Sequence, residues 1–127
     1  MRLAIASSNS VTIQRHFGRT KDYVVVTVDD GREVAREVRS VESPAQLVEV
    51  GGHGPGQFES RMRIMTASVQ DCDVLVAGGM GHPMVDAIER AGLDVILTNE
   101  RLVEDIISAY LAGTLEHQPD LAHEPCH

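Results

Sequence analysis

The first forty residues alternate between short apolar runs and polar turns in a way that predicts β-structure. Residues 2–7 form a short apolar run, typical of a buried strand, and residues 22–29 form a second run rich in β-branched side chains. The tetrapeptide Asp29-Asp30-Gly31-Arg32 predicts a tight turn, because Asp-Gly accepts the positive φ angles that hairpin turns require. Residues 33–38 then alternate between apolar and polar, so we expect them to pair antiparallel with the preceding strand.

The middle of the chain changes from strand-like to loop-like and then to helical patterning. Two prolines and a glycine cluster between residues 41 and 56 predict a long loop. The residues that follow carry an apolar stripe at helical spacing, which predicts one buried face of a helix that runs to about residue 70. The members of this stripe are Phe58, Met62, Met65 and Val69.

The rest of the chain predicts strands that alternate with helices. Residues 73–77 form an apolar run typical of a buried strand, and a glycine turn follows, with a helix opened by Pro83, whose missing N–H costs nothing there. Residues 94–97 predict another strand. A last helix is expected to be capped by Asn99 and ended by Gly113. Its apolar stripe consists of Val103, Ile106, Ile107, Tyr110 and Leu111.

This order of elements predicts an α/β fold, with a mixed five-stranded sheet, an N-terminal antiparallel hairpin and helices on the faces of the sheet. Right-handed crossovers would place strand 73–77 beside strand 2–7 and the strand that begins at Asp94 outside it, with the hairpin at the opposite edge. Open α/β sheets bind ligands where the connections reverse direction, outside the carboxyl ends of the strands. We therefore expect the loops at residues 7–19 and 78–83 to face one another across a crevice.

Length and charge restrict the classes of protein that fit this pattern. The chain has 127 residues, enough for one domain, and nineteen acidic against eleven basic residues give it a net charge of -8. A nucleic-acid partner is not expected, because binding to phosphates needs a basic surface. The N-terminal apolar run is too short for a signal peptide or a membrane span, and Cys72 and Cys126 give no disulfide framework. We expect a cytoplasmic protein with no membrane partner, present as a monomer or a weak homodimer.

The triplet His16-Phe17-Gly18 lies between the first two predicted strands and is the main candidate for chemistry. Its imidazole belongs to a loop with little core-forming character, where it can meet solvent, a metal or a ligand. No aspartate or glutamate occurs before Asp22, so nothing nearby indicates a carboxylate-assisted hydrolytic site. The alternative is that His16 only caps its own turn through a hydrogen bond.

Four segments of the chain resemble, in order and spacing, those of one known family. They are His16-Phe17-Gly18-Arg19, the His-Gly loop at residues 53–56, Ala77-Gly78-Gly79-Met80-Gly81, and Ala109-Tyr110-Leu111-Ala112-Gly113-Thr114-Leu115. Over residues 1–115 the chain is similar to the dinitrogenase iron–molybdenum cofactor biosynthesis family, which includes NifX and the C-terminal domain of NifB. The resemblance implies a ribonuclease H-like three-layer fold. It also implies a protein that binds or carries an iron–sulfur or molybdenum-containing cluster, or a precursor of one.

The resemblance further implies which residues hold such a cluster. His16 is the first-choice metal ligand and His53 the second, because imidazole suits iron and a cluster brings its own sulfides. Two cysteines cannot supply full cysteine ligation, which favours transient holding, with metallocluster donor and acceptor proteins as partners. Backbone N–H groups of the glycine turn would point at the anionic sulfides. The candidate cofactor-binding residues are Ser8, Asn9, His16, Phe17, Gly18, Gly79, Met80 and Gly81.

A second hypothesis is a small module that binds a nucleotide or phosphate ligand at the Gly78–Gly81 turn. This turn joins a strand to a helix, as a dinucleotide fingerprint requires, but Met84 stands where the third glycine belongs. His82, just before Pro83, is expected only to take the place of an N-cap residue for the helix that follows. An enzyme is not expected, because the chain lacks a serine elbow, a catalytic Cys–His spacing and the three placed acids of a two-metal nuclease.

The last residues, 116–127, lack the apolar periodicity of the domain and contain two prolines, so we expect a disordered tail. His123, Cys126 and His127 are candidates for holding a soft or borderline metal, as other His- and Cys-rich tracts do. The alternative is a solvated tail with no ligand. On either view the predicted domain ends near residue 115.

Overall fold

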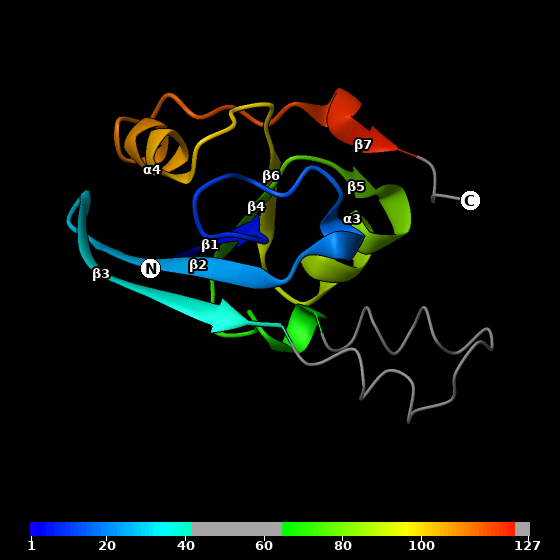
Figure 1. Cartoon of the computed structure of the whole chain (residues 1–127), viewed down its shortest axis with the longest axis horizontal. Coiled ribbons are helices and arrows are strands. Elements are labelled where there is room, and N and C mark those ends of the chain that lie inside the picture. Colours follow the sequence, from blue (N-terminus) through cyan, green and yellow to red (C-terminus); the bar gives the residue numbers. More distant parts are fainter. Residues whose placement is uncertain (42–64, 124–127) are drawn as a thin grey trace.

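The computed structural model describes residues 1–41 and 65–123, and an open sheet lies at its centre (Figure 1). The strands of this sheet are β1 (Arg2–Ser7), β2 (Asp22–Asp29), β3 (Arg32–Ser40), β4 (Val74–Ala77) and β6 (Asp94–Leu97). They form a five-stranded sheet in the order β3-β2-β1-β4-β6. β2 runs antiparallel to both neighbours, whereas β1, β4 and β6 are parallel. The predicted α/β class, mixed sheet, edge hairpin and strand order are confirmed.

Helices lie on both faces of this sheet. α3 spans His82–Arg90 and α4 spans Val103–Leu111, on opposite sides of the sheet (Figure 1). Residues 65–67 are also helical, and Met65 and Val69 are buried, as the predicted apolar stripe requires. The rest of that stripe and nearly all of the loop expected at residues 41–56 lie outside the described residues.

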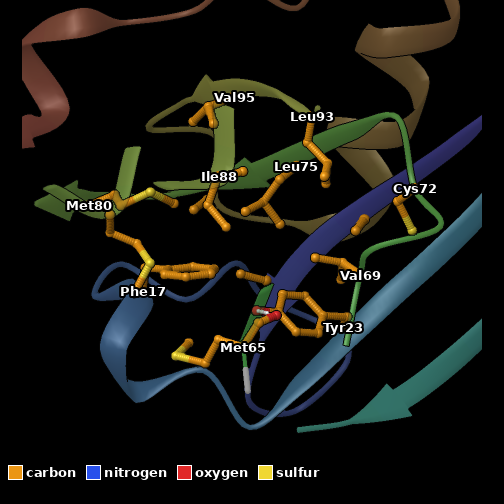
Figure 2. Packing of buried hydrophobic residues seen from close by; sticks show 14 of the residues in the cluster. Phe17, Tyr23, Met65, Val69, Cys72, Leu75, Met80, Ile88, Leu93 and Val95 are labelled. Atoms are coloured by element: carbon orange, nitrogen blue, oxygen red, sulfur yellow. Dashed lines mark hydrogen bonds between the residues drawn. The ribbon is translucent and has the colours of Figure 1, made fainter. Parts of the chain in front are cut away.

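Two apolar cores hold the layers together, one between the sheet and α3 and one between the sheet and α4. Burial on both faces explains why β1 and β4 are continuous apolar runs, since a central strand exposes neither face. Figure 2 shows the first core, with Tyr23 and Leu75 from the sheet and Ile88 from α3. The Tyr23 hydroxyl donates a hydrogen bond to the Met65 carbonyl oxygen at 3.3 Å, so this buried polar group is satisfied.

Local sequence signals explain several element boundaries. Asp30 and Gly31 have φ angles of +53° and +75°, which confirms the predicted Asp-Gly hairpin turn. Gly113, with φ of +76°, follows the end of α4, and Pro83 lies in the first turn of α3, both as predicted. These residues occupy positions where their backbone preferences fit the local geometry.

Two helix-capping predictions are wrong. The N-cap of α4 is Leu102, so Asn99 lies too far upstream to cap it. The reason is that the segment before α4 is tied to the loop after β1, where the Val103 N–H donates to the Val11 carbonyl oxygen at 2.9 Å. α3 begins at His82 itself, and its N-cap is Gly81, which has no side chain to contribute.

The C-terminal segment from residue 116 is not a disordered tail over its described part. It forms a 3-10 turn, η2 (Pro119–Leu121), and a short strand, β7 (Ala122–His123), which pairs in parallel with β5 (Met80–Gly81). The Leu97 N–H donates to Nδ1 of His117 at 3.0 Å, and the Asn99 N–H donates to Oε1 of Gln118 at 2.7 Å. These contacts use main-chain groups and polar side chains, so they leave no apolar period in the sequence. Residues 124–127, with Cys126 and His127, lie outside the described part.

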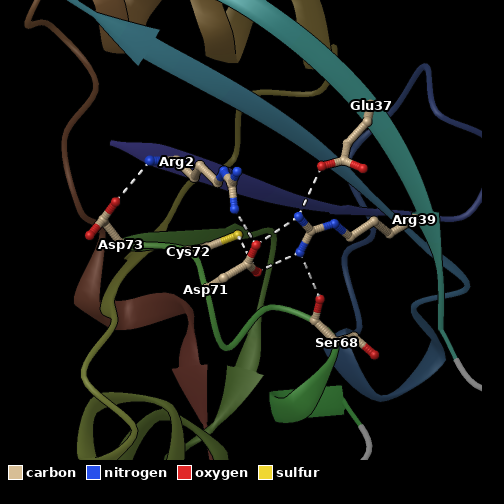
Figure 3. Close-up of polar contacts among 7 residues, drawn as sticks. All are labelled: Arg2, Glu37, Arg39, Ser68, Asp71, Cys72 and Asp73. Carbon is tan, nitrogen blue, oxygen red and sulfur yellow. Dashed lines mark hydrogen bonds and ion pairs between the residues drawn. The ribbon is translucent and has the colours of Figure 1, made fainter.

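A group of charged side chains connects two strands of the sheet to the segment before β4, and we call it the Arg39 cluster (Figure 3). Arg39 donates to the Asp71 carboxylate at 2.6 and 2.9 Å and to the Ser68 carbonyl oxygen at 3.2 Å. Arg2, at the start of β1, forms a second ion pair with Asp71. The cluster therefore links β3, β1 and the segment that enters β4. Within the described residues, no helix is long and apolar enough to span a membrane.

Candidate functional site

The candidate site lies where the loop after β1 meets the turn after β4. This loop contains the short 3-10 helix η1 (Phe17–Arg19). The Gly78 N–H donates to the Gln14 carbonyl oxygen at 3.0 Å, and the Phe17 N–H donates to the Gly79 carbonyl oxygen at 3.1 Å. The two segments thus meet at the predicted end of the sheet. The prediction of a crevice between them is wrong, because they are in direct backbone contact.

The two glycines of the turn make this close contact sterically possible. A Cβ atom at Gly79 would lie 2.6 Å from the Arg15 carbonyl oxygen, and one at Gly78 would lie 2.9 Å from the Arg15 Cα atom. Contacts this short to backbone atoms cannot be relieved by a side-chain rotation. Neither glycine requires a left-handed backbone, so the absence of a side chain is what the packing needs.

His16 is exposed, and its backbone is fixed on both sides. Its N–H donates to Oε1 of Gln14 at 3.1 Å, and its carbonyl oxygen accepts from the Arg19 N–H at 2.8 Å. The alternative in which the imidazole caps its own turn finds no support, since His16 forms no side-chain capping hydrogen bond. The geometry instead presents an imidazole on the surface of an ordered loop, where its nitrogen can meet a ligand.

Two of the candidate binding residues are core residues. Phe17 and Met80 are only 2% and 1% exposed and belong to the core that contains Tyr23 (Figure 2). The Phe17 and Tyr23 rings are tilted at 47° with centroids 6.2 Å apart. Phe17 and Met80 therefore anchor the two segments beneath the exposed His16 and Gly18, and their side chains do not face a surface ligand.

Ser8 and Asn9 act within the loop. Asn9 Oδ1 accepts the N–H groups of Val11 and Thr12 at 2.9 and 2.8 Å. The Ser8 hydroxyl donates to the Arg19 carbonyl oxygen at 3.2 Å. The Ser8 hydroxyl and the Asn9 side-chain oxygen are therefore engaged within the loop, and both residues shape its backbone.

The glycine turn is in contact with two neighbouring segments of the chain. Gly78 and Gly79 bond to the loop after β1, and Met80 and Gly81 pair with β7. The Leu121 carbonyl oxygen also lies 3.6 Å from the position of a Gly79 Cβ atom. A phosphate would bind through backbone N–H groups, and the Gly78 N–H already donates to the Gln14 carbonyl oxygen.

The loop around His16 is basic in a chain that is acidic as a whole. Arg15, Arg19 and Lys21 are exposed, and the first acidic residue is Asp22. Among the described residues, Arg15 and Arg19 form no ion pair, in contrast to Arg39. Their charges are therefore available to attract an anion toward His16. The sequence carried this signal as basic residues without an acid nearby, but the prediction used it only to exclude hydrolysis.

The described residues do not contain a ready-made metal centre. No group of three or more His, Cys, Asp or Glu side chains within them could hold a metal ion. Cys72 is buried beside Asp71, and this burial raises the pKa of its thiol to about 11, so it is protonated at neutral pH. The expected ligand His53 lies outside the described residues. β7 places the backbone of His123 opposite Gly81, at the same end of the sheet as His16.

Comparison with known proteins identifies the family. A model of the family described as "Dinitrogenase iron-molybdenum cofactor" matches residues 1–113. The chain belongs to this family, which confirms the resemblance seen in the sequence. It is also 22% identical over 115 residues to the FeMo cofactor biosynthesis protein NifB of Chlorobaculum tepidum. That match covers 91% of this chain but only 25% of NifB, so the chain spans about a quarter of that relative.

Solved structures show the same fold at low sequence identity. The crystal structure of PH0822 has a TM-score of 0.70 and 22% identity, covering 95% of this chain and 99% of the other. The apo form of the orange protein from Desulfovibrio gigas has a TM-score of 0.66 and 19% identity, covering 92% of each chain. At these identities the likeness concerns the fold alone.

Proposed function

We propose that this protein binds an anionic iron–sulfur or molybdenum-containing cluster, or a precursor of one, and carries it as a cargo. The observation that carries the proposal is the exposed His16 imidazole on a loop whose Arg15 and Arg19 form no ion pair with any other described residue. Imidazole nitrogen is a suitable ligand for iron and copper, and a preassembled cluster brings its own sulfides. Family membership and the match to part of a FeMo cofactor biosynthesis protein support the same cargo.

The chain's own residues would divide the work of holding this cargo. His16 would supply one metal ligand, while Arg15 and Arg19 would balance the negative charge of the sulfides. Phe17 would keep the loop anchored in the core. A single described ligand favours reversible holding, as a carrier requires. His53, His123, Cys126 and His127 stay predictions as additional ligands.

The proposal extends to the partners, location and oligomeric state of the protein. We infer metallocluster donor and acceptor proteins as partners, a cytoplasmic location, a monomer or weak homodimer, and no enzymatic activity. We also infer that the fold is ribonuclease H-like. The strand order β3-β2-β1-β4-β6, with β2 antiparallel to its neighbours, supports this class.

The test is an anaerobic titration with tetrathiomolybdate, a molybdenum–sulfur anion that is followed by its absorption. We expect His16→Ala to weaken binding by about tenfold or more, which corresponds to about 1.4 kcal/mol. His82→Ala is the matched control, because His82 is also exposed but lies at the start of α3, outside the loop. Both variants should unfold at the wild-type urea concentration, since neither removes buried contacts.

Three results would count against the proposal. Equal affinities of wild type and His16→Ala would remove His16 from the site. An equal loss in both histidine variants would indicate a general charge effect. A wild-type protein that ignores tetrathiomolybdate and reconstituted iron–sulfur species, but retains a nucleotide on purification, would favour the phosphate-binding alternative.

A further inference from the structure

The backbone of Gln14 is hydrogen-bonded to two different parts of the fold. Its N–H donates to the Ala6 carbonyl oxygen in β1 at 2.8 Å, and its carbonyl oxygen accepts from the Gly78 N–H at 3.0 Å. The adjacent residue, Ile13, forms a bridge with Ser7 at the end of β1. The Gln14 backbone is therefore tied both to β1 and to the turn after β4.

The Gln14 carboxamide spans the loop that carries His16. Its Oε1 atom accepts the His16 N–H at 3.1 Å, and its Nε2 atom donates to the Ser8 hydroxyl oxygen at 2.7 Å. The same Nε2 atom lies 3.5 Å from the Arg19 carbonyl oxygen. One side chain thus connects the beginning, the middle and the end of the loop, and it uses both its donor and its acceptor.

The described strand pairings do not include His16, so the hydrogen bond from its N–H to the Gln14 carboxamide is important for its backbone position. His16 has φ of -120° and ψ of 102°, an extended conformation just before η1. Its N–H has the Gln14 carboxamide as its partner. Without that acceptor, the N–H would turn to water and the peptide before His16 would lose a restraint on its orientation.

We propose that Gln14 is the positioning residue of the candidate site, which holds the backbone of His16 so that the imidazole faces the cargo. This inference rests on the proposed function for its ligand but not for its geometry. Gln14 does not touch the cargo. It acts through His16, whose N–H its Oε1 atom accepts, while its Nε2 atom donates to Ser8 and orients the carboxamide.

The experiment compares Gln14→Met with Gln118→Met. Gln118 is a matched control, because its Oε1 atom also accepts a backbone N–H, from Asn99 at 2.7 Å, but on a different segment. Hydrogen exchange of the His16 amide, measured by NMR, reports the positioning directly. We expect Gln14→Met to speed this exchange by about tenfold or more, because local opening frees the amide, and Gln118→Met to leave it unchanged. Tetrathiomolybdate affinity should fall in the first variant only.

A second variant separates positioning from a general loss of structure. Gln14→Glu keeps the acceptor for His16 but loses the donor for Ser8. Its His16 amide should therefore stay protected, while the added negative charge weakens binding of the anionic probe. If Gln14→Met fails to fold, an unprotected His16 amide in Gln14→Glu overturns the proposal.

The outcomes separate the two proposals. Unchanged exchange of the His16 amide in Gln14→Met overturns the positioning role, whatever the probe does. Equal losses of affinity in the Gln14→Met and Gln118→Met variants overturn it as well. If the wild-type protein binds neither tetrathiomolybdate nor reconstituted iron–sulfur species, the proposed function fails, and the exchange measurement alone decides whether Gln14 positions His16.

Discussion

Replacing Gly79 by alanine should disrupt the junction on which the candidate site is built. The new Cβ atom would lie 2.6 Å from the Arg15 carbonyl oxygen, where ordinary contact begins at 3.4 Å, so one backbone must move by about 0.8 Å. The Phe17 N–H is bonded to the Gly79 carbonyl oxygen at 3.1 Å, and a movement of this size along that direction would lengthen it to about 3.9 Å. That distance is outside the range of a hydrogen bond.

The size of the effect follows from these two losses. Overpacking of a rigid site typically costs about 1–3 kcal/mol, and a broken backbone hydrogen bond costs about 1 kcal/mol more. We expect Gly79→Ala to lower the free energy of unfolding by about 2–4 kcal/mol, with a fall in Tm on the order of 10 °C. Urea unfolding followed by circular dichroism measures the first quantity, and a thermal scan measures the second.

Gly92→Ala is the control for the loss of a glycine as such. Gly92 has φ of +100°, but nothing lies within 4 Å of its Cβ position, so only backbone strain of about 1–2 kcal/mol is expected there. Trypsin adds a local measurement, because Arg15 and Arg19 are exposed in the loop. Cleavage there should accelerate in Gly79→Ala and not in Gly92→Ala. The steric reasoning is refuted if Gly79→Ala costs less than Gly92→Ala and leaves the cleavage rate unchanged.

Two further predictions concern the rest of the fold. A hydrogen bond from Arg39, together with the charge of Arg2, holds the pKa of the Asp71 carboxyl well below its usual range. The ionised Asp71 therefore stabilises the fold above the usual pKa of about 4, and this stabilisation is lost as the pH falls. Asp71→Asn should therefore lower the free energy of unfolding more at pH 7 than at pH 3 in urea titrations, modestly because these groups are partly exposed; an equal loss at both pH values would contradict this. Deleting residues 117–127 should lower Tm by several degrees, because His117 and Gln118 bond to main-chain N–H groups and β7 pairs with β5. An unchanged Tm would show that these contacts contribute nothing.

The fold was predictable where side-chain chemistry dictates local structure. The β-branched run of residues 22–29 and the Asp30-Gly31 pair determined a hairpin, and crossover handedness then placed β4 beside β1. The C-terminal segment was not predictable in this way. Its partners are the backbone N–H groups of Leu97 and Asn99, which any residue would offer. The prediction that Asn99 caps α4 was wrong for a related reason. Asn99 is a good capping residue, but the backbone of its segment is hydrogen-bonded to other parts of the chain.

The position of the candidate site in the fold was predictable, but the roles of its individual residues were not. The sequence indicated that the His16 loop and the glycine turn meet at one end of the sheet. It could not show that Phe17 and Met80 point into the core, because an aromatic or a methionine beside a glycine fits either environment. Gln14 was overlooked because a single glutamine carries no pattern. Its role depends on distances to residues two and six positions away.

The Arg39 cluster has a consequence for protein engineering. Arg39 and Asp71 are 32 residues apart in the chain, and their ion pair holds these two positions together. The entropic cost of closing a loop between fixed ends grows only with the logarithm of its length. Changes in the number of residues between these two positions should therefore cost the sheet little, as long as the guanidinium, the carboxylate and the buried Met65 and Val69 are retained.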